Sequence, residues 1–193
     1  MLRVLLFEEL PDRAEAVREG LAHAGHDIVA SISAPLDLLP AIERAQPDVI
    51  VLDTESPSRD VLEHLCVVSQ SSPRPIVMFA SDGGGEAIRE AVRAGVSAYV
   101  VDGLDAGRIK SIVDVACARF EEFQRLKIEL AEANLKLSER KLVARAKGLL
   151  MASRGLSEDQ AYHALRRLAM SRKLRMGEVA QQLIDAAQLL GKG

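Results

Sequence analysis

The apolar positions in the N-terminal part of the chain alternate between two spacings. Residues 2–7 are almost continuously apolar, which is typical of a strand covered on both faces of a parallel sheet. Apolar residues then recur at helical spacing up to Gly25. The same alternation continues through strand 28–32, helix 36–45, strand 48–52, helix 58–70, strand 75–80, helix 84–94 and strand 97–101. These units predict an α/β fold with a five-stranded parallel doubly wound sheet over residues 1–118.

A long helix is expected to follow this domain. From about residue 104 to residue 153 the chain has no proline, and its only glycines are Gly107 and Gly148. Apolar residues alternate there at spacings of three and four, as in the seam of a coiled coil. They are Phe123, Leu126, Leu130, Ala133 and Leu137. We expect residues 119–138 to be a coiled-coil connecting helix that makes the chain a homodimer. The alternative is that the seam packs on the chain's own C-terminal helices.

The apolar residues after this segment predict a small three-helix all-α domain over residues 139–190. The first stripe ends at Gly155, a residue suited to a helix C-cap. Ser157 and Gln160 then fit a capping box, in which the two side chains bond backbone N–H groups of the first turn, so a new helix begins at once. Apolar residues from Val179 to Leu190 share one face of a third helix.

Charge divides the chain into two parts of opposite sign. Residues 1–118 carry 10 Lys and Arg against 19 Asp and Glu, whereas the remainder carries 15 against 9. Ten cations lie between Arg140 and Arg175, opposed only by Glu158 and Asp159. Such a segment is typical of a surface that binds a polyanion, although cations also solubilise exposed helix faces. With no tryptophan and few other aromatic residues, a nucleic acid would be read through charge, helix surface and shape.

Three carboxylates are expected at the carboxyl ends of the strands, where ligands of such sheets bind. Glu8 and Glu9 follow the first strand, and Asp53 follows the third. An oxygen-rich set of this kind suits a hard divalent cation such as Mg²⁺. With a cation present, Asp53 is a candidate phosphoryl acceptor. We expect no other cofactor, and no nucleophile or acid–base set is assembled for catalysis.

The C-terminal motifs resemble the ANTAR domain of bacterial antiterminators. They are Ala146-Lys-Gly-Leu-Leu-Met151, Gly155-Leu-Ser-Glu-Asp-Gln-Ala-Tyr162, Leu165-Arg-Arg167 and Val179-Ala180. The resemblance implies binding to paired small stem-loops in a nascent transcript, which disfavours a competing terminator hairpin. We expect the RNA-binding residues to be Arg145, Lys147, Arg154, Tyr162, Arg166, Arg167, Arg172, Lys173 and Arg175.

The N-terminal motifs Pro47–Asp53 and Gly95–Val101 resemble a response-regulator receiver domain of the CheY-like kind. Two positions depart from its pattern. Ala80 stands where a receiver has a hydroxyl residue, although Ser81 follows it, and Asp102 stands where a receiver has a phosphate-pairing lysine. An added phosphoryl group carries nearly two negative charges, so Asp102 would repel it. We therefore expect Asp53 not to be an obligatory switch.

Residues 55–60 and 99–104, taken with the C-terminal motifs, resemble the NasT-type members of the AmiR/NasT family. This implies control of nitrate or nitrite assimilation transcripts and restraint by a ligand-sensing partner protein. We expect a cytoplasmic, non-enzymatic antitermination regulator that affects RNA polymerase only indirectly and does not contact membranes. The alternative is a DNA-binding response regulator switched by phosphorylation of Asp53. Its last helix would have to read bases with Gln181, Gln182 and Asp185.

Overall fold

A computed structural model describes residues 1–9, 11–101 and 106–190, with side chains described outside 11–14, 106 and 190. The chain divides into two compact units, Met1–Gln124 (the first unit) and Arg125–Gly193 (the second unit). The division falls inside one helix, α5, which runs from Ala106 to Arg154. The predicted connecting segment 119–138 therefore lies wholly within a longer continuous helix.

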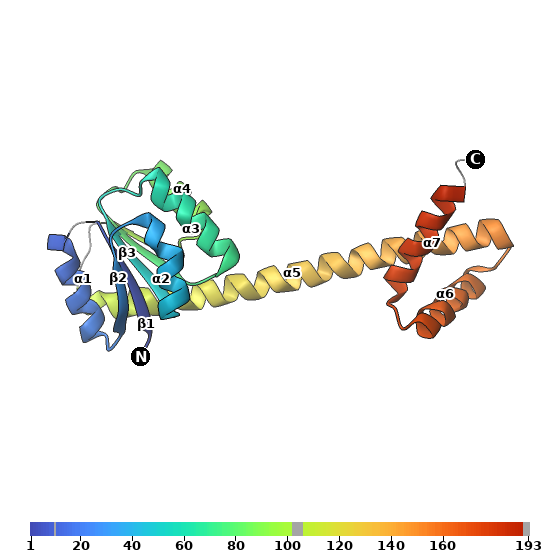
Figure 1. The fold of residues 1–193 in the computed structure, drawn as a ribbon, viewed down its shortest axis with the longest axis horizontal. Coiled ribbons are helices and arrows are strands. Elements are labelled where there is room, and N and C mark those ends of the chain that lie inside the picture. Colours follow the sequence, from blue (N-terminus) through green and yellow to red (C-terminus); the bar gives the residue numbers. More distant parts are fainter. Residues whose placement is uncertain (10, 102–105, 191–193) are drawn as a thin grey trace. The chain divides into compact units, whose positions relative to one another are not determined.

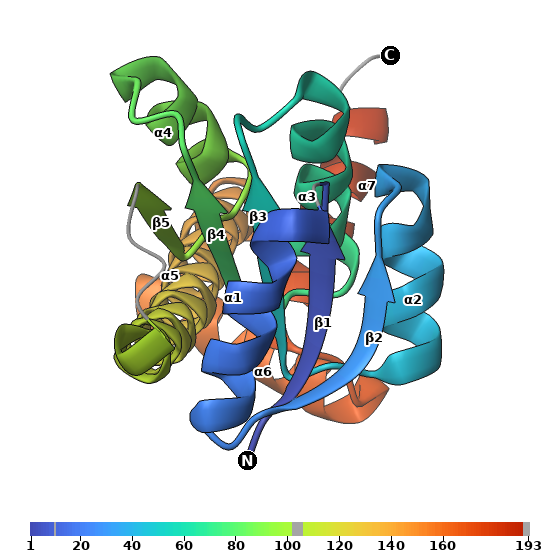
Figure 2. The ribbon, with the colours of Figure 1, turned by 90° about the vertical axis from the view of Figure 1, so that its left-hand side faces the viewer.

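The first unit is the predicted doubly wound sheet. Its strands are β1 Arg3–Glu8, β2 Asp27–Ile32, β3 Val49–Thr54, β4 Ile76–Ala80 and β5 Ala98–Val101. The sheet lies in the part of the ribbon coloured blue to green in Figure 1. All neighbouring pairs are parallel, and the strand order is β2-β1-β3-β4-β5 (Figure 2). The helices between them are α1 Pro11–His23, α2 Leu38–Ala45 after the 3₁₀ turn Pro35–Asp37, α3 Arg59–Ser71 and α4 Gly85–Arg93. The fold prediction is confirmed.

Both faces of this sheet are covered, which explains the continuous apolar runs. Helices α2, α3 and α4 pack on one face, against a core that includes Phe7 and Leu52. Helix α1 and the first turns of α5 pack on the other face, against Leu6 and Val51 (Figure 2). Because all six residues of β3 are buried, this strand forms the centre of the unit. Each fully buried aliphatic or aromatic side chain there contributes roughly 1.5–3 kcal/mol.

Strand β3 ends two residues later than the apolar pattern predicts. Asp53 remains paired in register with Glu8 of β1, and Thr54 with Ala80 of β4. The backbone ladder thus continues after the apolar side chains stop. This extension matters for function because it buries the candidate phosphoryl acceptor, of which only 1% is exposed.

The second unit is the predicted three-helix domain. The last turns of α5 pack with α6, Glu158–Arg172, and α7, Met176–Leu190, around buried residues that include Ala146, Leu165 and Ile184. The predicted capping box is present, since Ser157 accepts from the Gln160 N–H and the Gln160 side chain accepts from the Ser157 N–H. Throughout the described parts of the chain, no helix has the length and apolarity needed to cross a membrane.

Candidate nucleic-acid interface

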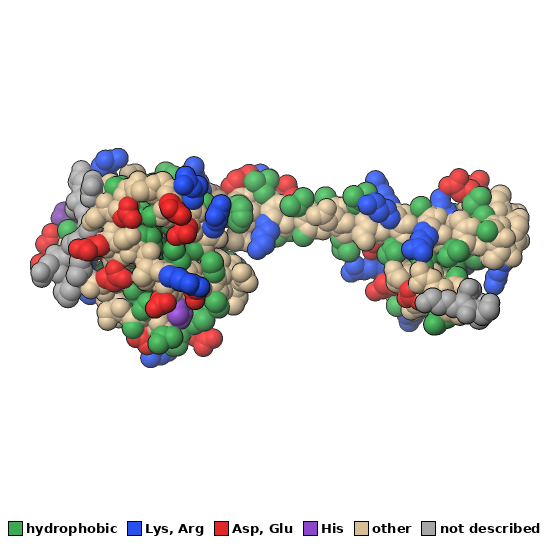
Figure 3. Space-filling model, turned by 90° about the horizontal axis from the view of Figure 1, so that it is seen from above, with side chains coloured by type: hydrophobic (Ala, Val, Ile, Leu, Met, Phe, Trp, Pro, Cys, Tyr) green, Lys and Arg blue, Asp and Glu red, His purple; other side chains and the backbone are tan. Residues whose placement is uncertain are grey.

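The core of the second unit directs most of the predicted cations outward. On α6, Leu165 is buried while the neighbouring Arg166 and Arg167 are exposed. On α5, Arg145 is exposed beside the buried Ala146, and Arg154 is exposed at the end of the helix. The face drawn in Figure 3 shows basic side chains gathered over the second unit and many acidic side chains over the first. The charge division of the sequence is therefore also a division between folded units.

Lys147 lies in different surroundings from the other predicted contacts. Its side chain is 19% exposed, and its Nζ lies 2.5 Å from Oε1 of Glu158 in the first turn of α6. The hydrogen bond and the charge of Lys147 hold the pKa of the Glu158 carboxyl below its usual value. Lys147, which the sequence analysis predicts to bind RNA phosphates, is thus already paired with the carboxylate of Glu158.

Three further predicted cations surround the connection between α6 and α7. Arg172 Nη1 donates to Gln182 Oε1 at 3.0 Å, and the Arg175 N–H donates to Glu178 Oε2 at 2.8 Å. Lys173 caps the C-terminus of α6 in the left-handed conformation, with φ of 55°. A cation at this position is favourable because the carbonyl end of a helix carries partial negative charge. All three side chains are exposed, so the connection presents a short basic edge.

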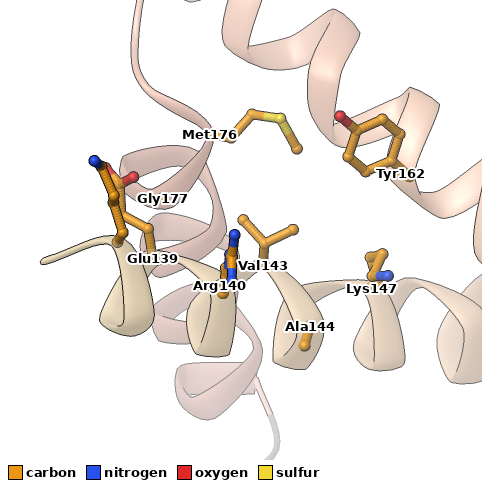
Figure 4. Close-up of a pocket in the computed structure, with 9 residues that line it drawn as sticks. Glu139, Arg140, Val143, Ala144, Lys147, Tyr162, Met176 and Gly177 are labelled. Atoms are coloured by element: carbon orange, nitrogen blue, oxygen red, sulfur yellow. The ribbon is translucent and has the colours of Figure 1, made fainter. Parts of the chain in front are cut away.

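Tyr162 lines a cavity of 380 Å³ within the second unit (Figure 4). Val143, Met176 and the Tyr162 ring give it an apolar wall, while Lys136, Arg140 and Lys147 add positive charge. The full lining is Lys136, Glu139, Arg140, Val143, Ala144, Lys147, Tyr162, Met176 and Gly177. The cavity therefore combines an aromatic side chain with cations, as a site for an unpaired nucleotide requires.

Sequence reasoning missed most of this cavity. Lys136 and Glu139 were not among the predicted contacts, although they lie at helical spacing on the same face of α5 as Lys147. Met176 comes from α7 and reaches this face only through the tertiary fold. A Cβ placed at Gly177 would lie 3.0 Å from Cγ of Glu139, which shows how closely α7 approaches α5 at this cavity.

The last helix offers few unoccupied polar groups of the kind a DNA-reading helix needs. On α7, Gln181 Nε2 donates to Asp185 Oδ1 at 2.6 Å, and Gln182 accepts from Arg172. Base recognition in a major groove depends on such side chains bonding to base edges. Here these polar groups bond to one another or to the neighbouring helix.

The predicted seam of the connecting helix is exposed. Within the second unit, Leu126, Leu130 and Leu137 are 51%, 63% and 51% exposed, so the chain's own tail helices do not cover them. Ala133 is exposed as well, as is Phe123 at the end of the first unit. Ile128 and Leu135, which the seam does not include, are also exposed.

The strand register brings the three predicted carboxylates to one sheet edge. Glu8 pairs with Asp53, and the Glu9 N–H donates to the Asp53 carbonyl at 3.2 Å. Their side chains, however, have separate partners. The Glu8 carboxylate accepts from the Arg18 guanidinium and the Ser31 hydroxyl, and the Glu9 carboxylate accepts from the Thr54 hydroxyl.

This arrangement does not provide the donor set expected for a metal ion. Among the described residues, no group of three or more His, Cys, Asp or Glu side chains is placed to hold one. The observed contacts of Glu8 and Glu9 therefore do not fit a magnesium ion. Magnesium at Glu8, Glu9 and Asp53 stays a prediction from sequence.

Hydrogen bonds join the two loops next to Asp53. The Asp82 carboxylate accepts from the Gly84 N–H at 2.7 Å and from the Ser56 hydroxyl at 2.9 Å. These two bonds lower the pKa of Asp82. Tyr99 donates its hydroxyl to the Asp82 carbonyl at 2.7 Å. Ala80 ends β4 as a buried residue, while Asp102 lies outside the described residues.

Comparisons with known proteins follow the two units. Residues 131–184 match the family model of the ANTAR domain. The chain is 30% identical over 187 residues to the Transcriptional regulatory protein PdtaR of Mycobacterium tuberculosis, covering 95% of this chain and 89% of that protein. It is 38% identical over 80 residues to the Nitrate regulatory protein of Klebsiella oxytoca, covering 42% and 20%. The signal receiver domain of a modulated diguanylate cyclase from Desulfovibrio desulfuricans G20 shares the fold, with TM-score 0.56 and 18% identity over 63% of this chain and 97% of that domain.

Proposed function

This chain belongs to the family of regulators that join a receiver-like domain to an ANTAR domain, and we propose that it is a transcription antitermination regulator that binds stem-loop RNA in nascent transcripts. The observation that carries the proposal is the basic surface of the second unit with the cavity beside Tyr162. The receiver-like first unit controls this activity, and the protein has no catalytic function of its own.

The exposed arginines account for the affinity of this interface. Arg145, Arg154, Arg166 and Arg167 contact successive phosphates, which releases counterions and makes the affinity fall steeply with salt. Arg172, Lys173 and Arg175 extend the basic surface at the connection between α6 and α7.

The cavity accounts for selectivity between RNA sequences. The major groove of an A-form stem is too narrow for side chains, so sequence is read from unpaired loop bases. At 380 Å³ the cavity lies in the range of small-ligand sites, roughly 300–1,000 Å³. A loop base enters it and stacks on Tyr162, while Arg140 and Lys147 hold the adjacent phosphates.

The exposed seam of α5 supports a homodimer. A leucine removed from water contributes on the order of 2 kcal/mol, and the seam leaves several large apolar side chains exposed. Two copies present two basic surfaces, which suits RNA that folds into two neighbouring stem-loops. Pairing of the α5 helices therefore couples assembly to RNA recognition.

We also propose a biological setting for this activity. The similarity to a protein named Nitrate regulatory protein supports a role at transcripts for nitrate or nitrite assimilation. A ligand-sensing partner protein holds the regulator inactive until its signal arrives. The regulator acts in the cytoplasm on the transcript and influences RNA polymerase only through the RNA.

The proposal is tested by measuring binding of the full chain to RNA with two stem-loops and to duplex DNA, at several salt concentrations. We expect a preference for RNA and a slope in log affinity against log salt of roughly −0.7 to −0.9 per phosphate contact. The double variant Arg166→Glu, Arg167→Glu should bind RNA more weakly, with a shallower slope.

A matched control reverses two exposed arginines on α4 of the first unit, Arg89→Glu and Arg93→Glu. This variant carries the same change in net charge, so it should bind RNA as the wild type does. If the Arg166 and Arg167 variant binds as tightly as the wild type with an unchanged slope, the interface is wrong. A preference for duplex DNA would instead favour the DNA-binding response regulator.

A further inference from the structure

Three carboxylates at one sheet edge create an electrostatic requirement. Asp53 is buried, Glu8 pairs with it in register, and Glu9 follows Glu8 directly. Neighbouring carboxylates repel one another, and burial further disfavours their charged forms. Such a set is stable in its ionised form only if a positive charge or several hydrogen-bond donors compensate it.

The chain supplies a positive charge at this edge from α1. The Arg18 guanidinium forms an ion pair with the Glu8 carboxylate, whose side chain is only 11% exposed. Ser31 of β2 holds the pair in place, because Arg18 Nη2 lies 3.0 Å from its hydroxyl oxygen and the hydroxyl donates to Glu8. Arg18 thus contacts two strands, β1 and β2, while 46% of its side chain remains exposed.

One hydroxyl group compensates the second carboxylate. Thr54, buried at the end of β3, donates to Glu9, and its oxygen lies 3.0 Å from the Ser56 carbonyl. Glu8 is therefore drawn toward α1 and β2, and Glu9 toward the end of β3. A cation that needs oxygen ligands from one direction finds them turned apart.

We propose that Arg18 is a built-in cation that takes the place of a divalent metal ion at the carboxyl ends of the strands in the receiver-like domain. With Arg18 present, Mg²⁺ gains little by entering, because it would compete with a tethered guanidinium for Glu8. Without Arg18, Glu8 loses the partner that turns it away, and the edge becomes a site for a divalent cation. The domain thereby keeps one arrangement whatever the metal supply.

The test measures thermal unfolding of the full chain with and without 10 mM MgCl₂ at matched ionic strength. This concentration is about ten times the Kd of a site that binds Mg²⁺ with millimolar affinity. Arg18→Gln retains donors but loses the charge, whereas Arg18→Lys retains the charge. We expect the wild type and Arg18→Lys to be insensitive to Mg²⁺. Arg18→Gln should gain on the order of 5 °C in unfolding temperature with Mg²⁺.

Calorimetric titration with Mn²⁺ provides a second readout that does not depend on stability. Arg18→Gln should bind one ion, and adding Glu8→Gln to it should abolish that binding. Arg44→Ala, which removes an exposed arginine of α2, serves as the control and should behave as the wild type. Equal Mg²⁺ responses in the wild type and Arg18→Gln, or no binding to Arg18→Gln, would overturn the proposal.

Discussion

Lys147 and Arg166 carry the same charge but differ in what an incoming phosphate must displace. Arg166 is exposed on the outer face of α6, and a phosphate meets it directly. Lys147 is largely buried and paired with Glu158, so a phosphate has to compete with a carboxylate for it. The basic surface therefore contains exposed cations that can bind phosphate directly and one cation, Lys147, whose binding of phosphate is weakened by Glu158.

Replacing Glu158 with glutamine should strengthen RNA binding by roughly twofold to fivefold, the range expected for one exposed ion pair. The change frees Lys147 and removes a negative charge that repels phosphate. Because the pKa of Glu158 lies below its usual value, the carboxyl stays ionised, and the pair intact, until the pH falls through that lowered pKa. The gain should therefore be present across neutral pH, as measured by fluorescence anisotropy.

Asp159→Asn is the matched control for this prediction. Asp159 is exposed in the same first turn of α6, and among the described residues it has no ion pair. Its replacement removes one negative charge without releasing a cation, so the gain should be smaller. An equal gain in the two variants would mean that only net charge matters and that the Lys147 pair does not.

At the scale of elements, sequence patterns predicted what depends on local spacing. The five strands, the capping box at Ser157 and the exposure of Arg166 and Arg167 beside Leu165 follow from periodicity and short-range hydrogen bonds. The end of β3 could not be predicted in this way, because polar residues such as Asp53 and Thr54 also continue the hydrogen-bonded ladder of a sheet. Contacts between elements could not be predicted either. Arg18 and Glu8 are ten residues apart and Lys147 and Glu158 are eleven apart, so no local spacing pairs them.

The connecting segment of α5 shows what a periodic pattern leaves undecided. The spacing identified a seam, but Ile128 and Leu135 are as exposed as the seam residues. In the heptad that the seam defines they share one position, which faces away from a coiled-coil partner. The helix thus carries two apolar stripes, and only the seam is expected to pair.

Introducing aspartate at Leu130 and Leu137 should convert a dimer into a monomer, because buried charges in the seam lack partners. Sedimentation velocity over a range of concentrations measures the change. Ile128→Asp with Leu135→Asp is the matched control, with the same chemistry on the other stripe, and it should remain dimeric. A wild type that is monomeric at high concentration, free and RNA-bound, would contradict the dimer.

At the scale of the whole molecule, opposite charge and separate cores assign different tasks to the two units. The acidic first unit holds the candidate phosphoryl acceptor, and the basic second unit holds the candidate RNA surface. Each unit has its own buried core, and α5 is the helix with residues in both units, so it offers one continuous route for a signal. The residues around the carboxylates Glu8, Glu9 and Asp53 decide which signals the first unit can receive.

We predict that phosphorylation of Asp53 is not that signal. Asp53 is 1% exposed, Ala80 offers no hydroxyl at the end of β4, and Asp82 joins the two neighbouring loops. Arg18 is also paired with Glu8. These contacts support the prediction that Asp53 is not an obligatory switch.

Substitution of Asp53 should accordingly leave antitermination intact. Asp53→Asn keeps the buried volume while removing the acceptor, and Asp53→Ala removes both, so the pair separates loss of chemistry from loss of packing. Readthrough of a terminator reporter should match the wild type in Asp53→Asn, and any deficit in Asp53→Ala should follow its lower unfolding temperature. Stable labelling of the wild type by acetyl phosphate, with a gain in RNA affinity that both variants lose, would show instead that Asp53 is the switch.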